Sequence, residues 1–163
     1  MPFTPFHFGP GAALHSLAPR HVSFLAFCGA NVLVDFEPLY YMLSHQYPVH
    51  RFFHTYVGVS VVVAATTAAF LIARWISRMV RMPDLFEWQE LGLRGVLAGS
   101  ALGGYSHIAL DSVMHPDIRP LAPFSDANAL YLRIGITELH WGCLAAGIVG
   151  LVILGFRRDP SAL

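Results

Sequence analysis

Three side chains with metal-binding chemistry recur at intervals of four residues near the middle of the chain. In the stretch GGYSHIALDSVMHPD, His107, Asp111 and His115 follow one another at this spacing. Residues four apart lie on the same face of an α-helix. Imidazole nitrogens and carboxylate oxygens are ligands for zinc and related divalent ions. The spacing therefore predicts a helix with one polar stripe that can coordinate a metal ion.

A second pair of histidines has the same spacing, and two acidic residues precede it. His50 and His54 in HRFFHT would share one face if the segment were helical. Asp35 and Glu37 in VDFEP are only two residues apart, so they point to different sides of a regular helix. Both can face one site only if Pro38 ends the helix there. We therefore favour Asp35 as the metal ligand.

The composition indicates that apolar elements position these residues. The chain has 163 residues, of which 55% are hydrophobic and 12% are charged, against about 25% charged in soluble domains. Its length predicts one domain over residues 1–163. So few charges predict a membrane protein, and the net charge of zero gives no electrostatic basis for nucleic-acid binding. Cys28 and Cys143 lie in apolar runs and are predicted to be buried thiols.

The apolar segments predict an all-α, polytopic membrane bundle of about four transmembrane helices. Three segments reach the length of about 20 residues that a span requires, namely residues 56–80, 91–114 and 134–156. Residues 21–43 form a fourth predicted span, whose last turns are polar and break at Glu37-Pro38. Residues 8–18 are too short to span and are predicted to form a half-inserted or re-entrant helix.

The arginines predict the orientation of the four spans. All ten basic residues are arginine, and seven of them fall on one side, which the positive-inside rule makes cytoplasmic. The chemistry-bearing residues then lie at the opposite, non-cytoplasmic ends of the spans. They comprise Asp35, Glu37, His50, His54, His107, Asp111, His115, Glu138 and His140. Four helices would therefore deliver imidazoles and carboxylates to one layer of the bundle.

Such a layer needs compensation for its polar groups. An aspartate at the centre of a spanning helix costs about 2.5–3.5 kcal/mol, and less near an end. A single histidine is often a packing residue, and Asp111 alone could pair with Arg119. Glu138 and His140 are two apart, so both cannot point into the bundle from a regular helix. The convergence of so many such groups favours a shared metal ion over separate packing roles.

Four short motifs follow one another along nearly the whole chain: TPFHFGPG with His7, VDFEP with Asp35 and Glu37, HRFFHT with His50 and His54, and GGYSHIALD with His107 and Asp111. In this order they resemble motifs of a family of bacterial inner-membrane proteins described as metal-dependent hydrolases, which is distantly similar to zinc-dependent phospholipase C. Two residues separate Thr4 from His7, where family members usually have the threonine directly before the histidine. The late HxxxE motif of the secreted enzymes is absent.

The resemblance implies a helical site for one or two divalent ions, zinc being the favoured metal. One ion would be held by Asp35, His50, His107 and Asp111. His7 would hold a second ion together with Asp111, which would bridge the two. His54 would be a ligand or would orient one.

These inferences predict a membrane-bound, metal-dependent hydrolase of the bacterial inner membrane. Because the site would lie at headgroup depth, the predicted substrate is a phosphoester in a lipid or lipid-linked molecule. Glu37 or Glu138 would be the general base, and Arg51 or Arg119 would steady the charge of the phosphate. Asp111 completes the predicted catalytic set.

Two other classes of function fit parts of the pattern. The ion could be structural, in a membrane scaffold or regulatory partner. Alternatively, the polar layer could belong to a proton or metal-ion pathway, because ionisable groups inside membranes often mark transport. A pathway should continue to the other side, but cytoplasmic halves such as VVVAATTAAFLIA and AAGIVGLVILG offer only Thr66 and Thr67. This one-sidedness disfavours transport.

Overall fold

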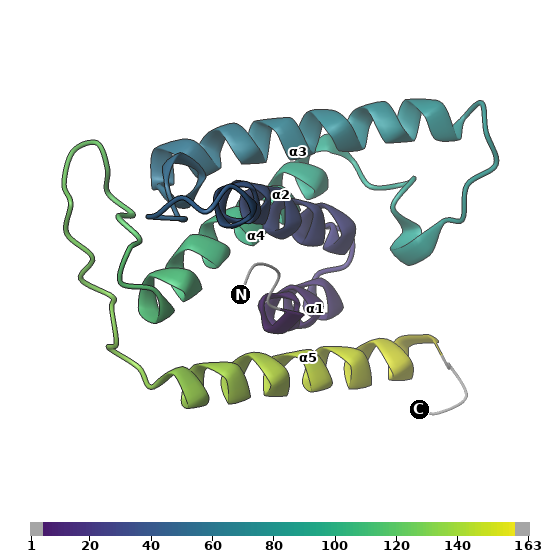
Figure 1. Cartoon of the computed structure of the whole chain (residues 1–163). Helices are drawn as coiled ribbons and strands as arrows, with labels where there is room; N and C mark the ends of the chain where they lie inside the picture. The colour runs from purple at the N-terminus through teal and green to yellow at the C-terminus, as the bar shows by residue number, and fades with distance from the viewer. Residues whose placement is uncertain (1–4, 159–163) are drawn as a thin grey trace.

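The computed structural model describes residues 5–158, which form helices and connecting loops and, within this range, no strand. The α-helices are α1 (Phe8–Leu17), α2 (Phe24–Leu43), α3 (Tyr56–Ser77), α4 (Leu93–Met114) and α5 (Ile136–Arg158). Helices α3 and α5 lie on opposite sides, with α1, α2 and α4 between them (Figure 1). The all-α prediction is confirmed, and each predicted apolar segment contains one helix.

Two helix starts are fixed by side-chain caps. The Ser23 side chain accepts a hydrogen bond from the backbone N–H of Ala26, and the Thr55 side chain accepts one from Gly58, so α2 begins at Phe24 and α3 at Tyr56. The HRFFH segment therefore precedes α3. The helix on which a shared face of His50 and His54 depended is not formed, because an irregular stretch leads into a short 3₁₀ helix, Phe52–His54.

Helix α2 does not end at its proline. It continues through Pro38 to Leu43, so the predicted break at Glu37-Pro38 is wrong. Proline removes one backbone hydrogen bond from a helix interior, but Pro38 is fully buried, and its packing helps to offset that cost. Because α2 stays regular, Asp35 and Glu37 leave it in different directions.

Glycines allow α4 to lie directly against the start of α2. A Cβ atom on Gly99 would clash with the backbone oxygen of Ser23, and one on Gly103 with the backbone oxygen of Phe27. Both glycines lie on the face of α4 that carries His107 and Asp111 further along, because each of these residues follows the one before it at an interval of four. The close approach of the two backbones therefore brings the acidic part of α2 to this face.

Helix α5 packs on α1 through a second crossing of small residues. A Cβ atom on Gly9 would clash with the backbone of Cys143, and one on Gly150 with the backbone of Ala12. Such close packing by small residues is typical of helices in membranes. Cys143 is buried here as a free thiol, and Cys28, half-buried on α2, is free as well.

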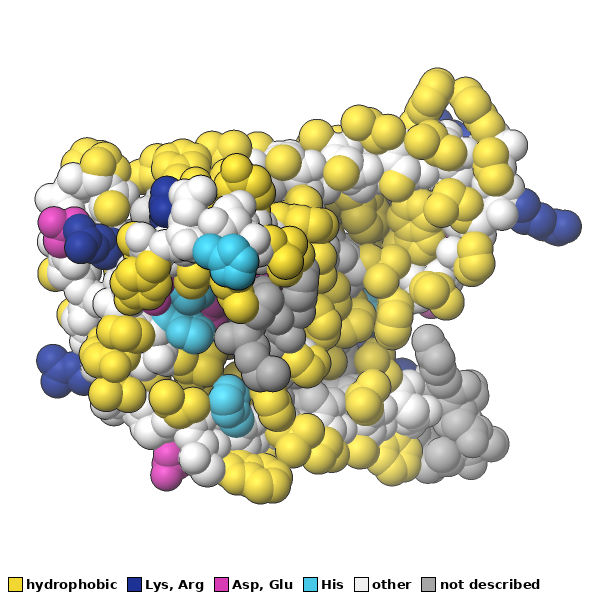
Figure 2. Space-filling view, viewed as in Figure 1, with side chains coloured by type: hydrophobic (Ala, Val, Ile, Leu, Met, Phe, Trp, Pro, Cys, Tyr) yellow, Lys and Arg dark blue, Asp and Glu magenta, His cyan; other side chains and the backbone are white. Residues whose placement is uncertain are grey.

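The outer faces of α3 and α5 are apolar. Both α3 and residues Ile136–Arg157 of α5 are long and apolar enough to cross a membrane. Hydrophobic side chains cover much of the face shown in Figure 2, and the large exposed ones on these two helices include Val61, Ile72, Trp75, Trp141, Ile148, Leu151 and Phe156. Among the described helices only these two meet the criteria for a span, so α2 and α4 as further spans remain a prediction.

Candidate metal centre

Four buried side chains meet between α2, α4 and the 3₁₀ helix that precedes α3. This buried group consists of Asp35, His54, His107 and Asp111, each offering an atom within 4.8 Å of the others. The Nε2 atom of His107 lies 3.3 Å from Asp35 Oδ1 and 3.2 Å from Asp111 Oδ2. The Nε2 atom of His54 lies 3.6 Å from the same Asp111 oxygen. The buried group could hold a metal ion.

The polar atoms of the buried group fit this role. The Nε2 atoms of His54 and His107, together with Asp111 Oδ1, are buried and make no hydrogen bond with the described residues. Leaving a buried polar atom without a partner costs about 1–3 kcal/mol, so such atoms are uncommon in folded proteins. Coordination of one cation would satisfy nitrogens and carboxylate oxygens together.

A second set of possible ligands shares Asp111 and is more accessible. This open group consists of His50, Asp111 and His115. The ring centroids of His50 and His115 are 4.5 Å apart, and both half-buried side chains line a pocket of about 270 Å³. Burial lowers the pKa of both imidazoles, which favours the neutral form that binds metals.

His7 approaches Asp111 from the N-terminal side. It ends the short 3₁₀ helix Pro5–His7, and its Nε2 atom lies 3.2 Å from Asp111 Oδ1. Burial lowers the pKa of His7 to about 4, against the opposing attraction of Asp111, so the ring is neutral at pH 7. Asp111 is thus the common neighbour of His7, the buried group and the open group.

Glu37 lies behind His54 rather than inside the buried group. Its Oε2 atom accepts hydrogen bonds from the backbone N–H groups of Arg51 (3.0 Å) and Phe53 (2.9 Å) and lies 3.5 Å from His54 Nδ1. The Nε2 atom of His54 faces Asp35 and Asp111 instead. This placement gives no support to Glu37 as a general base, because the His54 ring separates it from Asp35 and Asp111. Glu37 therefore faces the Nδ1 side of the His54 ring.

Two further orienting residues were missed from the sequence. His50 Nδ1 donates to Asp117 Oδ1 at 2.9 Å, and Asn31 Oδ1 lies 3.1 Å from His107 Nδ1. Metal-binding histidines commonly make such a bond through their second ring nitrogen. Asn31 lies four residues before Asp35, a spacing that could have revealed it. Asp117 gives only a weak signal, because it lies in an irregular loop.

The Asp117 carboxylate is held in its ionised form. Burial is the largest single influence and would raise its pKa, but the hydrogen bond and charge of His50 together with backbone hydrogen bonds outweigh burial, and the pKa lies below the ordinary value. Asp117 also accepts hydrogen bonds from the backbone N–H groups of Val49 (3.2 Å) and His50 (3.3 Å). It therefore fixes both the ring of His50 and the backbone that carries it.

The resemblance assigned His50 to the wrong group. The structure places His54, and not His50, with Asp35 and His107, while His50 joins His115 in the open group. The physical reason is that the segment between the two histidines is irregular. Their rings remain neighbours, with centroids 4.6 Å apart, but they face different parts of the site.

Two arginines line a second pocket beside the open group. Arg51, Arg119 and His50 contribute to its lining, and its volume is about 480 Å³. The Arg51 side chain is held in place by a hydrogen bond from Nε to the Pro48 oxygen (2.9 Å). Arg119 forms an exposed ion pair with Asp126 at 2.8 Å, so the alternative in which it pairs with Asp111 is wrong.

The predicted candidates on α5 lie outside both groups. Glu138 is exposed in the first turn of α5. The His140 ring stacks on Phe6, with centroids 4.5 Å apart. Neither residue belongs to a described set of metal donors, so the structure offers no support for Glu138 as a general base.

Asp117→Asn is expected to weaken metal binding at the open group about 10–100-fold, the usual effect of losing an orienting carboxylate. The amide would no longer stabilise the Nδ1–H tautomer of His50 as a carboxylate does. Titration of the metal-free protein with Zn²⁺ would measure the effect, and the buried group should keep its affinity. Asp126→Asn, on an exposed carboxylate of the same loop, is the matched control. Equal affinities for the two variants would contradict the role of Asp117.

The buried and open groups meet at one carboxylate and differ in access to the surface. The side chains of the buried group are shielded from solvent, whereas the open group borders two pockets, one of which is lined by two arginines. Comparison of the chain with family models, curated proteins and solved structures finds no match. The chemistry of these residues is therefore the basis for a functional proposal.

Proposed function

We propose that the chain is a membrane-embedded, metal-dependent hydrolase that acts on a phosphoester in a lipid or lipid-linked substrate. The observation that carries the proposal is the sharing of Asp111 between a buried and an open set of donors. The buried group would hold one divalent ion, zinc being the first candidate. The open group would hold a second ion that substrate can reach through the adjacent pockets.

A bound divalent ion lowers the pKa of coordinated water to about 7 and polarises a phosphoryl oxygen. The chain's own residues supply position and charge. Glu37 and Asp117 keep the rings of His54 and His50 in place. Arg51 and Arg119 line the pocket beside His50, and their guanidinium groups suit the oxygens of a phosphate.

The membrane part of the proposal is supported by the apolar faces of α3 and α5. We place the chain in the bacterial inner membrane as a multi-pass protein, with the metal centre on the non-cytoplasmic side opposite most arginines. Headgroup depth then suggests that the phosphate belongs to a membrane lipid. Membership of the inner-membrane metal-dependent hydrolases is part of this proposal, supported by the meeting of the VDFEP and HIALD motifs in one group.

A second candidate is a non-enzymatic membrane scaffold or regulatory protein with a structural metal ion. The observation that favours it is the complete burial of His54 and His107, each 0% exposed. Structural metal sites are closed, whereas catalytic sites keep a position open to water or substrate. The two candidates therefore differ in whether the open group takes part in chemistry.

Elemental analysis and a hydrolysis assay on the purified full chain would test the proposal. We expect bound transition metal, and release of a phosphate product from phospholipid in detergent micelles that stops with chelator and returns with Zn²⁺. Arg119→Gln should raise KM several-fold with metal content unchanged. Arg133→Gln, an exposed arginine outside the pocket lining, is its control.

His115→Ala separates the two candidates. For the hydrolase, this variant should lose turnover while the buried group keeps its ion. A wild-type protein that binds metal but releases no product from any lipid phosphate would contradict the hydrolase and favour the scaffold. Absence of bound metal, with no uptake on titration, would contradict both.

A further inference from the structure

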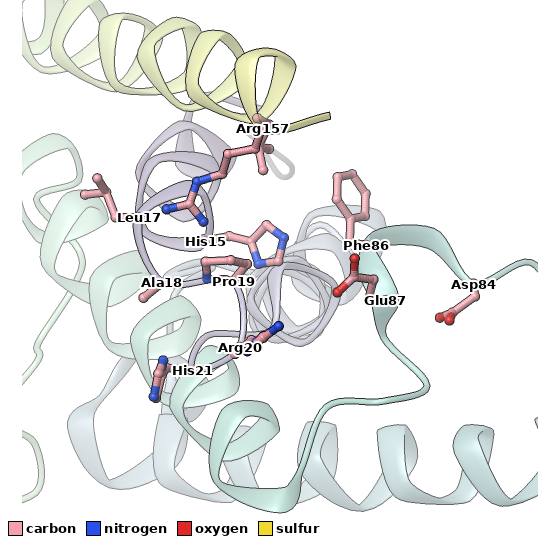
Figure 3. Close-up of a pocket in the computed structure, with 11 residues that line it drawn as sticks. His15, Leu17, Ala18, Pro19, Arg20, His21, Asp84, Phe86, Glu87 and Arg157 are labelled. Atoms are coloured by element: carbon pink, nitrogen blue, oxygen red, sulfur yellow. The ribbon is translucent and has the colours of Figure 1, made fainter. Parts of the chain in front are cut away.

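A separate pocket, drawn in Figure 3, is lined by residues at the end of the bundle opposite the metal centre. Its volume is about 590 Å³, and its lining comes from the end of α1, the α1–α2 connection, the α3–α4 connection and the last turns of α5. The metal donors instead lie near the C-terminal ends of α2 and α4 and just before α3. No residue of the metal centre contributes to this pocket.

Side chains of both charge signs converge on the pocket without neutralising one another. Arg20 and Arg157 line it together with Asp84 and Glu87, and all four side chains are exposed. Within residues 5–158 these four form no ion pair with each other. Figure 3 shows Arg157 and Glu87 turned toward the space around the His15 ring. A ligand that carries both a negative and a positive group would match this lining.

His15 gives the pocket a fixed polar wall. The residue is only 3% exposed, and its Nδ1–H donates to the backbone oxygen of Val22 at 2.8 Å. Because Val22 supplies a carbonyl oxygen, Nδ1 must be the donor. In the neutral ring Nε2 is then the nitrogen left to accept an N–H or O–H from a ligand.

The loop that carries Glu87 has an unusual backbone. Phe86 and Glu87 are consecutive non-glycine residues in the left-handed region, with φ of 59° and 54°. This conformation is costly for residues with a side chain and persists where surrounding contacts fix it. The Phe86 ring packs edge-to-face on His15 at 5.7 Å and on Phe24 at 5.1 Å. These contacts help to hold Glu87 at the rim, and Figure 3 shows Arg157 on the other side of the His15 ring.

We infer that this pocket binds a phosphoethanolamine group, with its phosphate between Arg20 and Arg157 and its ammonium toward Glu87 and His15. Guanidinium groups suit phosphate oxygens, and a carboxylate with an imidazole nitrogen suits an ammonium group. The assignment rests on the proposed membrane location only for the source of the ligand, a lipid headgroup, and not on the metal chemistry. The arginine-rich end of the bundle is where that proposal places the cytoplasmic headgroups.

Binding measurements on the full chain in detergent would test this inference. The probes are short-chain phosphatidylethanolamine, short-chain phosphatidylglycerol, which lacks the amine, and water-soluble O-phosphoethanolamine. We expect phosphatidylethanolamine to bind about tenfold more tightly than phosphatidylglycerol, the ratio that one charge-assisted hydrogen bond gives. Binding of the lipid well above that of the soluble compound identifies a membrane ligand, and equal binding identifies the free molecule.

Two variants report on the two halves of the ligand. Glu87→Gln should abolish the preference for the amine while phosphatidylglycerol binding stays unchanged. Arg157→Gln should weaken both lipids about tenfold. Arg78→Gln, an exposed arginine at the same end that does not line the pocket, should weaken neither.

Equal binding of the two lipids by the wild type, or equal weakening by Arg78→Gln and Arg157→Gln, would overturn the inference. Thermal unfolding measured on the same samples shows whether each variant is folded, whether or not the protein binds metal. Because the variants lie away from the metal centre, loss of lipid binding with an unchanged unfolding temperature tests this inference alone, and metal content and hydrolysis test the hydrolase proposal separately.

Discussion

Replacing Asp111 with asparagine is expected to remove bound metal from both groups at once. The Asp111 carboxylate belongs to the buried and the open group, and it also lies 3.2 Å from His7. An amide keeps the size of the side chain but loses its charge and one of its two acceptor oxygens. Loss of an orienting residue alone costs about 10–100-fold in metal affinity, so loss of this shared ligand should exceed about 100-fold.

Elemental analysis and thermal unfolding would measure this loss. Wild-type protein should gain thermal stability on adding Zn²⁺, by about 2.7 kcal/mol at a concentration of 100 times Kd, and Asp111→Asn should gain none. Asp126→Asn, which changes an exposed aspartate of the 115–135 loop, should bind metal as the wild type does. An Asp111→Asn protein with full metal content would show that the ion is held elsewhere.

Gly103→Ala is expected to destabilise the bundle by about 1–3 kcal/mol, the usual cost of overpacking a tight interior. The added Cβ atom would clash with the backbone oxygen of Phe27, which belongs to α2 and cannot move alone. The relief is a shift of α2 away from α4. That shift would carry Asp35 away from His107, so metal affinity should fall together with the unfolding temperature.

Gly142→Ala makes the same chemical change on α5, where a new Cβ atom meets nothing within 4 Å. Alanine is a better helix former than glycine, so this variant should be unchanged or more stable by about 0.5–1 kcal/mol. Thermal unfolding of both variants in one detergent gives the comparison. A Gly103→Ala protein as stable as Gly142→Ala would contradict the close packing of α2 on α4.

Part of the site could be predicted from spacing alone. His107 and Asp111 are four residues apart on a long helix, so their shared face followed from helix geometry, and the structure keeps it. The same rule failed for His50 and His54. There the cap at Thr55 starts α3 after the histidines, so no helix aligns them. Only the packed structure shows which of the two rings meets Asp35.

The residues missed from the sequence act through other residues. Asp117 reaches His50 across 67 positions, and the loops that bring them together have no periodic pattern to reveal this contact. Glu37 looked like a free carboxylate near the site, but backbone N–H groups of Arg51 and Phe53 occupy it. Such contacts depend on how irregular segments fold back on helices, which composition and hydropathy do not encode.

The helices themselves were easier to predict than their relation to a membrane. Apolar runs located α2 to α5 with bounds that agree within three residues. Among the helices of residues 5–158, only α3 and part of α5 are apolar enough to cross a membrane in their own right. The polar residues of α2 and α4 include the candidate metal donors, and they also lower the mean hydropathy of these helices. The same side chains therefore support the metal site and weaken the evidence that α2 and α4 span a membrane.

The scatter of the donors along the chain constrains when an ion can be captured during biosynthesis. The buried group takes Asp35 from α2 and His107 with Asp111 from α4, so more than half of the polypeptide must emerge before these ligands coexist. A nascent chain that stops before α4 contains neither group. Helix α5 contributes no described donor, and capture can therefore precede its synthesis. The ion would then tie α2 to α4 while the last helix is still being made.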